Sequence, residues 1–162
     1  MTHLRSNSLT PKARILVLDA EQRSALAAVR SLGRAGATVF VASALRHPLA
    51  GGSAFAHGKL YTPDPAREAA AYTASIIKYA IDKDLDFILP TTDTSTMLLV
   101  GQQAMGAARV LCPPREAYER VTDKANLLEI ADSVGVRAPD TVVATNRLEI
   151  EAAIGGFGNP VV

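Results

Sequence analysis

The stretch that decides the fold is Ile15-Leu16-Val17-Leu18, a run of large apolar residues followed by the polar residues 19–24 (DAEQRS). Such a run is typical of a strand covered on both faces, as in a parallel sheet. Residues 23–35 then carry apolar side chains at helical spacing, and Gly36 supplies a C-terminal stop. A second apolar run follows at residues 38–42 (TVFVA). This order predicts a right-handed, parallel β-α-β unit and therefore an α/β fold.

The next segments continue the alternation less clearly. Residues 43–58 contain two adjacent glycines and no clear period, so we expect a loop with one short helical turn. Residues 59–61 form a short strand at best. The sequence TPDP at residues 62–65 predicts the start of a helix that continues to about Lys83. The reason is that aspartate can cap a helix and proline at its first position loses no hydrogen bond.

Three further segments complete this series. Residues 86–90 (DFILP) predict a buried strand, and residues 91–93 (TTD) are placed to cap the helix that follows. Residues 109–112 (RVLC) predict another strand, which two prolines stop. Pro114 can open a short helix that reaches Arg120.

The pattern starts afresh after this point. A helix is predicted at residues 124–134, a strand at 141–144 and a helix to about Ile154 after a capping-box pattern at 146–149 (NRLE). The final residues 158–162 (GNPVV) look like a strand that is not finished. We therefore expect a flexible tail at residues 1–12, a first domain at 13–121 and the truncated start of a second domain at 122–162.

Composition narrows the function classes. The chain has 162 residues, 48% hydrophobic and 20% charged residues, and a net charge of +1, which provides no field for nucleic acid or an anionic membrane. Its single cysteine, Cys112, excludes an internal disulfide, and its three histidines lack partners at zinc-ligand spacing. No apolar run approaches the roughly 18 residues of a spanning helix. We expect a cytoplasmic protein.

Topology selects the candidate site. In an open parallel sheet, ligands bind beyond the carboxyl ends of the strands, which indicates the loops at residues 19–24, 43–52 and 91–93. The first of these loops contains no glycine, so it is not the dinucleotide fingerprint. Arg23 and Ser24 at a helix N-terminus can bind a carboxylate or phosphate, but they are equally consistent with a solvated residue and a cap.

Thr92 and Asp93, with Thr91 before them, offer two hydroxyls and a carboxylate where a substrate would lie, and such a sequence is also an ordinary helix cap. Cys112 follows a buried strand without a nearby histidine, which favours an inert thiol.

A sharper signal begins at Asp123-Lys124. This pair, a helix, Gly135-Val136 and then Pro139-Asp140-Thr141 resemble the junction that enters the ATP-binding region of ATP-grasp ligases, in the carbamoyl-phosphate-synthase-like branch. Arg137-Ala138 interrupts the Gly-Val-Pro order of that family. Residues 22–25 (QRSA), 90–93 (PTTD) and 112–114 (CPP) are similar to the preATP-grasp domain that precedes the core.

This resemblance implies a Rossmann-like, three-layer preATP-grasp domain followed by the truncated start of an α+β ATP-grasp domain. It implies an ATP-dependent carboxylate-amine or carboxylate-thiol ligase that acts through an acyl phosphate, with ATP and magnesium as cofactors of the full-length protein. Lys124 would approach the phosphates of ATP, and Arg23, Ser24, Thr92 and Asp93 would face a small-molecule carboxylate or amine. We expect this fragment alone to be inactive and to hold no cofactor tightly, and a homodimer is compatible with the family.

Two alternatives stay open. One is a stand-alone flavodoxin-like or receiver-like binding module in which Asp19 and Asp93 are the acidic loop residues, although no lysine follows the last strand as a receiver requires. The other is a structural or oligomerisation domain without a ligand.

Overall fold

The computed structural model describes residues 12–102 and 104–156. The chain divides into two compact units, Met1–Arg115 and Glu116–Val162, which are described separately. The domain boundary expected after residue 121 stays a prediction.

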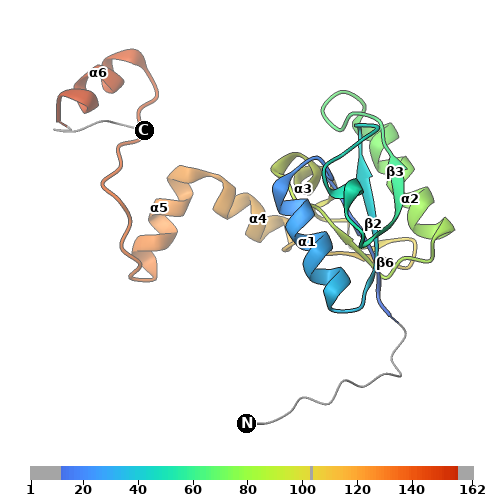
Figure 1. Cartoon of the computed structure of the whole chain (residues 1–162). Coiled ribbons are helices and arrows are strands. Elements are labelled where there is room, and N and C mark those ends of the chain that lie inside the picture. The colour runs from blue at the N-terminus through green and yellow to red at the C-terminus, as the bar shows by residue number, and fades with distance from the viewer. Residues whose placement is uncertain (1–11, 103, 157–162) are drawn as a thin grey trace, which may run out of the picture. The chain divides into compact units, whose positions relative to one another are not determined.

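The first unit is built on one sheet (Figure 1). Its strand order is β3-β2-β1-β4-β6-β5, in which β5 pairs antiparallel with β6 and all other pairs are parallel. The predicted α/β class with a parallel sheet is thus confirmed. The strands are β1 (Arg14–Val17), β2 (Thr38–Ser43), β3 (Ala56–Tyr61), β4 (Phe87–Leu89), β5 (Ala104–Met105) and β6 (Ala108–Val110).

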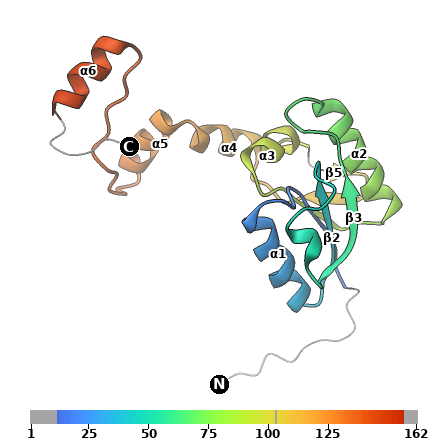
Figure 2. The ribbon, with the colours of Figure 1, turned by 45° about the horizontal axis from the view of Figure 1, so that its top comes forward.

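Helices cover both faces of this sheet. The side chains of β1 point alternately to the two faces and are apolar on each, so each face has to be covered. Ile15 and Val17 pack on the side of α1, whereas Leu16 and Leu18 pack on the side of α2 and α3. The result is a three-layer arrangement with α1 and α2 on opposite sides of the sheet, which the turned view in Figure 2 also shows. The helices are α1 (Arg23–Arg34), the 3-10 turn η1 (Ala50–Gly52), α2 (Ala69–Asp82) and α3 (Asp93–Leu99).

Helix α2 begins later than the sequence pattern predicts. Asp64 does cap, but it caps an isolated turn: its carboxylate accepts the Ala66 N–H at 2.9 Å, and its carbonyl accepts the N–H groups of Arg67 and Glu68. Glu68 then has a non-helical backbone and precedes the first residue of α2. The prediction of a helix from residues 62–65 is therefore wrong by about one turn.

Two strands also differ from expectation. β3 is a full parallel strand of 6 residues rather than three, because its backbone pairs with β2 although exposed and half-buried side chains alternate along it. β5 has only 2 residues, too few for a periodic signal, and Gly106 with a φ of +68° makes the turn into β6.

The second unit contains α5 (Lys124–Ser133) and α6 (Arg147–Gly156), and α4 (Arg115–Thr122) begins at the division. The predicted strand at residues 141–144 is wrong: this segment has no strand partner in the described part of the unit, and Val142 and Val143 are exposed. The predicted strand at residues 158–162 lies outside the described residues. No helix among those described has the length and apolar character needed to cross a membrane.

Candidate functional site

A buried carboxylate joins two loops at the carboxyl edge of the sheet. Asp19 follows β1 with a φ of +56°, in the left-handed region that aspartate tolerates better than most residues. Its Oδ2 accepts hydrogen bonds from the Thr91 N–H at 2.9 Å, the Thr91 hydroxyl at 3.3 Å and the Ser95 hydroxyl at 2.6 Å. β1 and β4 are neighbouring strands, so the loops that follow them lie side by side. The three hydrogen bonds to Asp19 fix the loop after β1 to the start of α3.

A small cavity lies beside this carboxylate. It has a volume of about 20 Å³, and we call it the Asp19 cavity. The Ser43 hydroxyl, at the end of β2, donates to Glu21 Oε2 at 2.7 Å on one side of it. Its polar lining consists of Asp19, Glu21, Ser43, Thr62 and Tyr72.

Two hydroxyls of this cavity have no hydrogen-bond partner among the residues that the structure describes. They are Thr62 Oγ1 and Tyr72 Oη, and their residues are only 1% and 2% exposed. Native proteins pair nearly all buried polar groups, so each unpaired hydroxyl calls for a physical explanation. Thr62 is held by its backbone N–H, which donates to the Ser43 carbonyl at 3.0 Å, and Tyr72 projects from the first turn of α2.

The cavity carries negative charge. Among the described residues, no lysine, arginine or histidine forms an ion pair with Asp19 or Glu21. Burial, together with the charges of these two carboxylates, raises the pKa of the Tyr72 phenol well above its ordinary value of 10.0. Tyr72 is therefore a neutral hydroxyl at physiological pH.

The structure places the four predicted substrate-binding residues at this same edge. Arg23 and Ser24 are exposed in the first turn of α1, and Gln22 occupies the cap position without a side-chain bond, so Ser24 is not the cap. Thr92 is the cap of α3, and its Oγ1 accepts the Ser95 N–H at 3.3 Å. Asp93 is the exposed first residue of α3. Their roles toward a substrate stay predictions.

Sequence reasoning missed most of the cavity. Asp19 and Ser43 each lie at the end of a buried strand, in loops that topology had already selected, and this was the available signal. Tyr72 reads as part of the apolar face of α2, and Thr62 as part of a helix start. Nothing local reveals that these two hydroxyls meet the end of β1.

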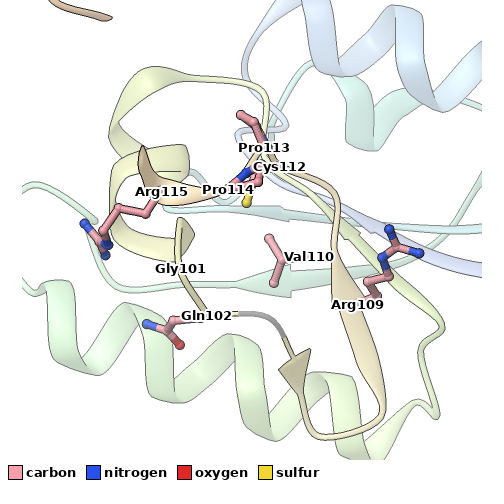
Figure 3. Close-up of a pocket in the computed structure, with 8 residues that line it drawn as sticks. All are labelled: Gly101, Gln102, Arg109, Val110, Cys112, Pro113, Pro114 and Arg115. Atoms are coloured by element: carbon pink, nitrogen blue, oxygen red, sulfur yellow. The ribbon is translucent and has the colours of Figure 1, made fainter. Parts of the chain in front are cut away.

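A larger pocket of about 640 Å³ lies along β6 near the end of α3 (Figure 3). Arg115 and Arg109 lie at opposite ends of it, and Val110 lies between them. Arg115 Nη2 donates to the Val100 carbonyl at 2.6 Å. Burial raises the pKa of Cys112, which keeps the thiol protonated at neutral pH and supports the inert interpretation. The polar groups do not converge on one point, as a specific site requires.

Lys124 lies in the second unit as the exposed first residue of α5. Asp123 caps this helix, since its Oδ1 accepts the Ala125 N–H at 2.9 Å. An ammonium beside the N-terminal N–H groups of a helix suits a phosphate. In the part of the chain that the structure describes, no three Asp, Glu, His or Cys side chains gather where they could hold a metal ion.

No protein-family model matches the chain, and no curated protein matches it significantly. Solved structures do. The biotin carboxylase domain of a single-chain bacterial carboxylase matches 90% of this chain with a TM-score of 0.59 at 19% identity. N5-carboxyaminoimidazole ribonucleotide synthetase from Thermotoga maritima matches 91% with a TM-score of 0.59 at 18% identity. Glycinamide-RNase-transformylase T from Mycobacterium tuberculosis matches 78% with a TM-score of 0.52 at 17% identity.

These neighbours are longer proteins, and this chain spans only 34%, 37% and 37% of their respective lengths. They are ATP-grasp enzymes, so the resemblance inferred from the sequence is confirmed at the level of the fold. At identities of 17–19% this likeness shows the fold alone: the chain has the Rossmann-like α/β fold of the matched part of these enzymes.

Proposed function

We propose that this chain is part of an ATP-dependent ligase that activates a carboxylate as an acyl phosphate and passes it to an amine or a thiol. The observation that carries the proposal is the match of 90% of the chain to a biotin carboxylase domain and of 91% to a ribonucleotide synthetase. Because the chain spans about a third of those enzymes, the activity belongs to a longer protein. Residues 1–162 alone are then inactive.

In this proposal, Lys124 binds the phosphates of ATP. Its exposed ammonium lies in the first turn of α5, where the positive end of the helix also favours an anion. ATP and magnesium supply the phosphoryl group and stabilise its charge during transfer. The described residues contain no acidic cluster that fits magnesium, so we assign the metal ligands to other parts of the ligase.

The substrate of the proposed ligase lies at the carboxyl edge of the sheet. Arg23 and Ser24 at the start of α1 are exposed, so a guanidinium and helix N–H groups are available to a carboxylate. Thr92 and Asp93 begin the neighbouring α3. Both helices start where ligands bind in open parallel sheets, and this shared position supports one substrate site.

The receiver-like alternative has less support. Asp19 is buried and its Oδ2 already accepts three hydrogen bonds, which leaves it poorly placed as a phosphate acceptor or metal ligand at an open site. The absence of an acidic cluster among residues 12–102 and 104–156 points the same way.

The test is ADP formation by the complete protein with magnesium, ATP and a panel of carboxylates combined with amines or thiols. We expect ADP only when both a carboxylate and a nucleophile are present. Lys124→Ala should raise the KM for ATP, whereas Lys78→Ala, which removes an exposed lysine paired with Asp82 on α2, should not. A complete protein that never forms ADP would refute the proposal.

A further inference from the structure

The wall of the Asp19 cavity contains buried hydroxyl groups whose hydrogen bonds are not formed within the described chain. Thr62 Oγ1 and Tyr72 Oη both lie in its wall and are almost fully buried, and neither has a hydrogen-bond partner within residues 12–102 and 104–156. A buried hydroxyl without a hydrogen bond costs stability, so a protein gains by filling such a space with a group that bonds to it. The cavity therefore calls for a polar occupant.

The charged side chains of the cavity wall indicate which kind of polar group fits the cavity. Asp19 and Glu21 face the same small volume, and within the described residues neither has a cationic partner. Carboxylates in a confined site are stabilised by an opposite charge. A water molecule would satisfy the hydroxyls but would add no positive charge beside the two carboxylates, whose described partners are all neutral donors.

The volume of the cavity limits which cation can enter it. A volume of about 20 Å³ admits one water-sized group, so a guanidinium or an aromatic ring is excluded. Divalent ions prefer about six or more oxygen ligands in a defined shell, and the described residues form no acidic cluster of that kind. A primary ammonium is cationic, has the size of a water molecule and carries three N–H donors.

We propose that the Asp19 cavity binds the primary ammonium group of a small molecule. Asp19 and Glu21 compensate its charge, and the oxygens of Thr62 and Tyr72 accept its N–H donors. If the chain belongs to the proposed ligase, on which this step rests, the molecule is the amine-bearing substrate of that ligase. Asp19 is fixed to Thr91 and Ser95 before any ligand arrives, so the acceptor is positioned in advance.

The experiment is an NMR titration of residues 1–162 without ATP. Ethylammonium chloride is the probe, ethanol is the neutral probe of matched size, and tetramethylammonium carries the charge without N–H donors. We expect saturable shifts of the backbone amides of Leu45, Thr62 and Thr91 with ethylammonium only. Leu45 is included because its N–H donates to the Ser43 hydroxyl at 3.0 Å.

Substitutions locate the binding. Glu21→Gln removes one charge but keeps an acceptor for the Ser43 hydroxyl, and we expect it to weaken ethylammonium binding at least about fivefold, as loss of a charged hydrogen bond does. Tyr72→Phe removes one unpaired hydroxyl and should weaken binding about twofold or more. Asp82→Asn, a matched loss of an exposed carboxylate at the other end of α2, should have no effect.

Three outcomes would overturn the inference: no saturable shift with ethylammonium, equal shifts with ethanol, or equal weakening by Asp82→Asn and Glu21→Gln. If Glu21→Gln fails to fold, Tyr72→Phe still provides the comparison. Because the titration contains no ATP, amine binding that persists while the complete protein forms no ADP would refute the ligase and retain the ammonium site.

Discussion

The Ser95 hydroxyl donates a hydrogen bond to the Asp19 carboxylate at 2.6 Å, between two buried side chains that lie 76 residues apart in the chain. This bond fixes the left-handed loop after β1 to the first turn of α3. Both helices that begin at the carboxyl edge of the sheet thereby keep a defined position relative to the Asp19 cavity. The contact is thus structural, and it also organises the candidate site.

Removing this hydroxyl should destabilise the fold. Ser95→Ala leaves the buried Asp19 carboxylate without one of its donors, and we expect the free energy of unfolding to fall by about 1–3 kcal/mol. The matched control is Thr94→Ala, one residue earlier on the same helix, where the side chain is exposed. Urea denaturation measures both. Equal effects of the two substitutions would show that the Ser95–Asp19 bond contributes nothing specific.

Gly33 should not tolerate a methyl group although it lies inside α1. A Cβ there would come within 2.5 Å of side-chain atoms of Phe55, including its Cβ. The expected gain in helix propensity, about 1 kcal/mol, is then outweighed by overpacking of about 1–3 kcal/mol. Gly155→Ala in α6 is the control, since no atom of the described residues lies within 4 Å of its added Cβ. A Gly33→Ala protein that is more stable than the wild type in urea denaturation would contradict this packing.

Tyr72 should make stability depend on alkaline pH. Its pKa in the folded chain is raised above the ordinary value of 10.0, mainly by burial. The unfolded chain therefore ionises first, so the stabilisation is complete below about pH 10 and is lost as the pH rises toward the folded-state pKa. Tyr72→Phe should reduce the loss of unfolding free energy between about pH 9 and about pH 11.

At neutral pH the same Tyr72→Phe substitution should leave stability unchanged or raise it, because the deleted hydroxyl has no hydrogen-bond partner in the described part of the chain. The exposed Tyr61 provides the control through Tyr61→Phe. If both substitutions change the alkaline pH dependence equally, burial at Tyr72 is not the cause.

Cys112 should react slowly with iodoacetamide at neutral pH. Burial raises the pKa of its thiol above the ordinary value of 9.0, so the reactive thiolate is scarce. We expect the rate per mole to lie below that of free cysteine at pH 7.5 and to keep rising above pH 9, as mass spectrometry can follow. Faster alkylation than free cysteine would indicate an activated thiol and reopen a catalytic role.

Local patterns in the sequence sufficed for the parallel sheet. The apolar runs at β1 and β2, with a glycine-terminated amphipathic helix between them, leave few other topologies. The local sequence pattern did not predict strands correctly where strand pairing depends on residues that are far apart in the chain. β3 takes its strand form from β2, and Val142 and Val143 have high strand propensity but no partner strand in the described part of their unit.

The sequence predicted that the candidate site lies at the carboxyl edge of the sheet and in which loops, but it did not predict the cavity itself. Thr92 at the cap of α3 and the starts of both helices follow from turn and cap chemistry. The Asp19 cavity instead depends on Thr62 and Tyr72 reaching the end of β1, which is a tertiary contact. Unpaired hydroxyls are visible only once side chains are packed.

The central claim is that the chain belongs to an ATP-dependent ligase, and a thermal-shift titration with Mg-ATP tests it most directly. The complete protein and residues 1–162 alone are compared, since a ligand that binds the native state stabilises it by about 2.7 kcal/mol at 100 times its Kd. We expect the complete protein to gain thermal stability and residues 1–162 to show no shift. A complete protein whose Tm does not respond to millimolar Mg-ATP would contradict the claim.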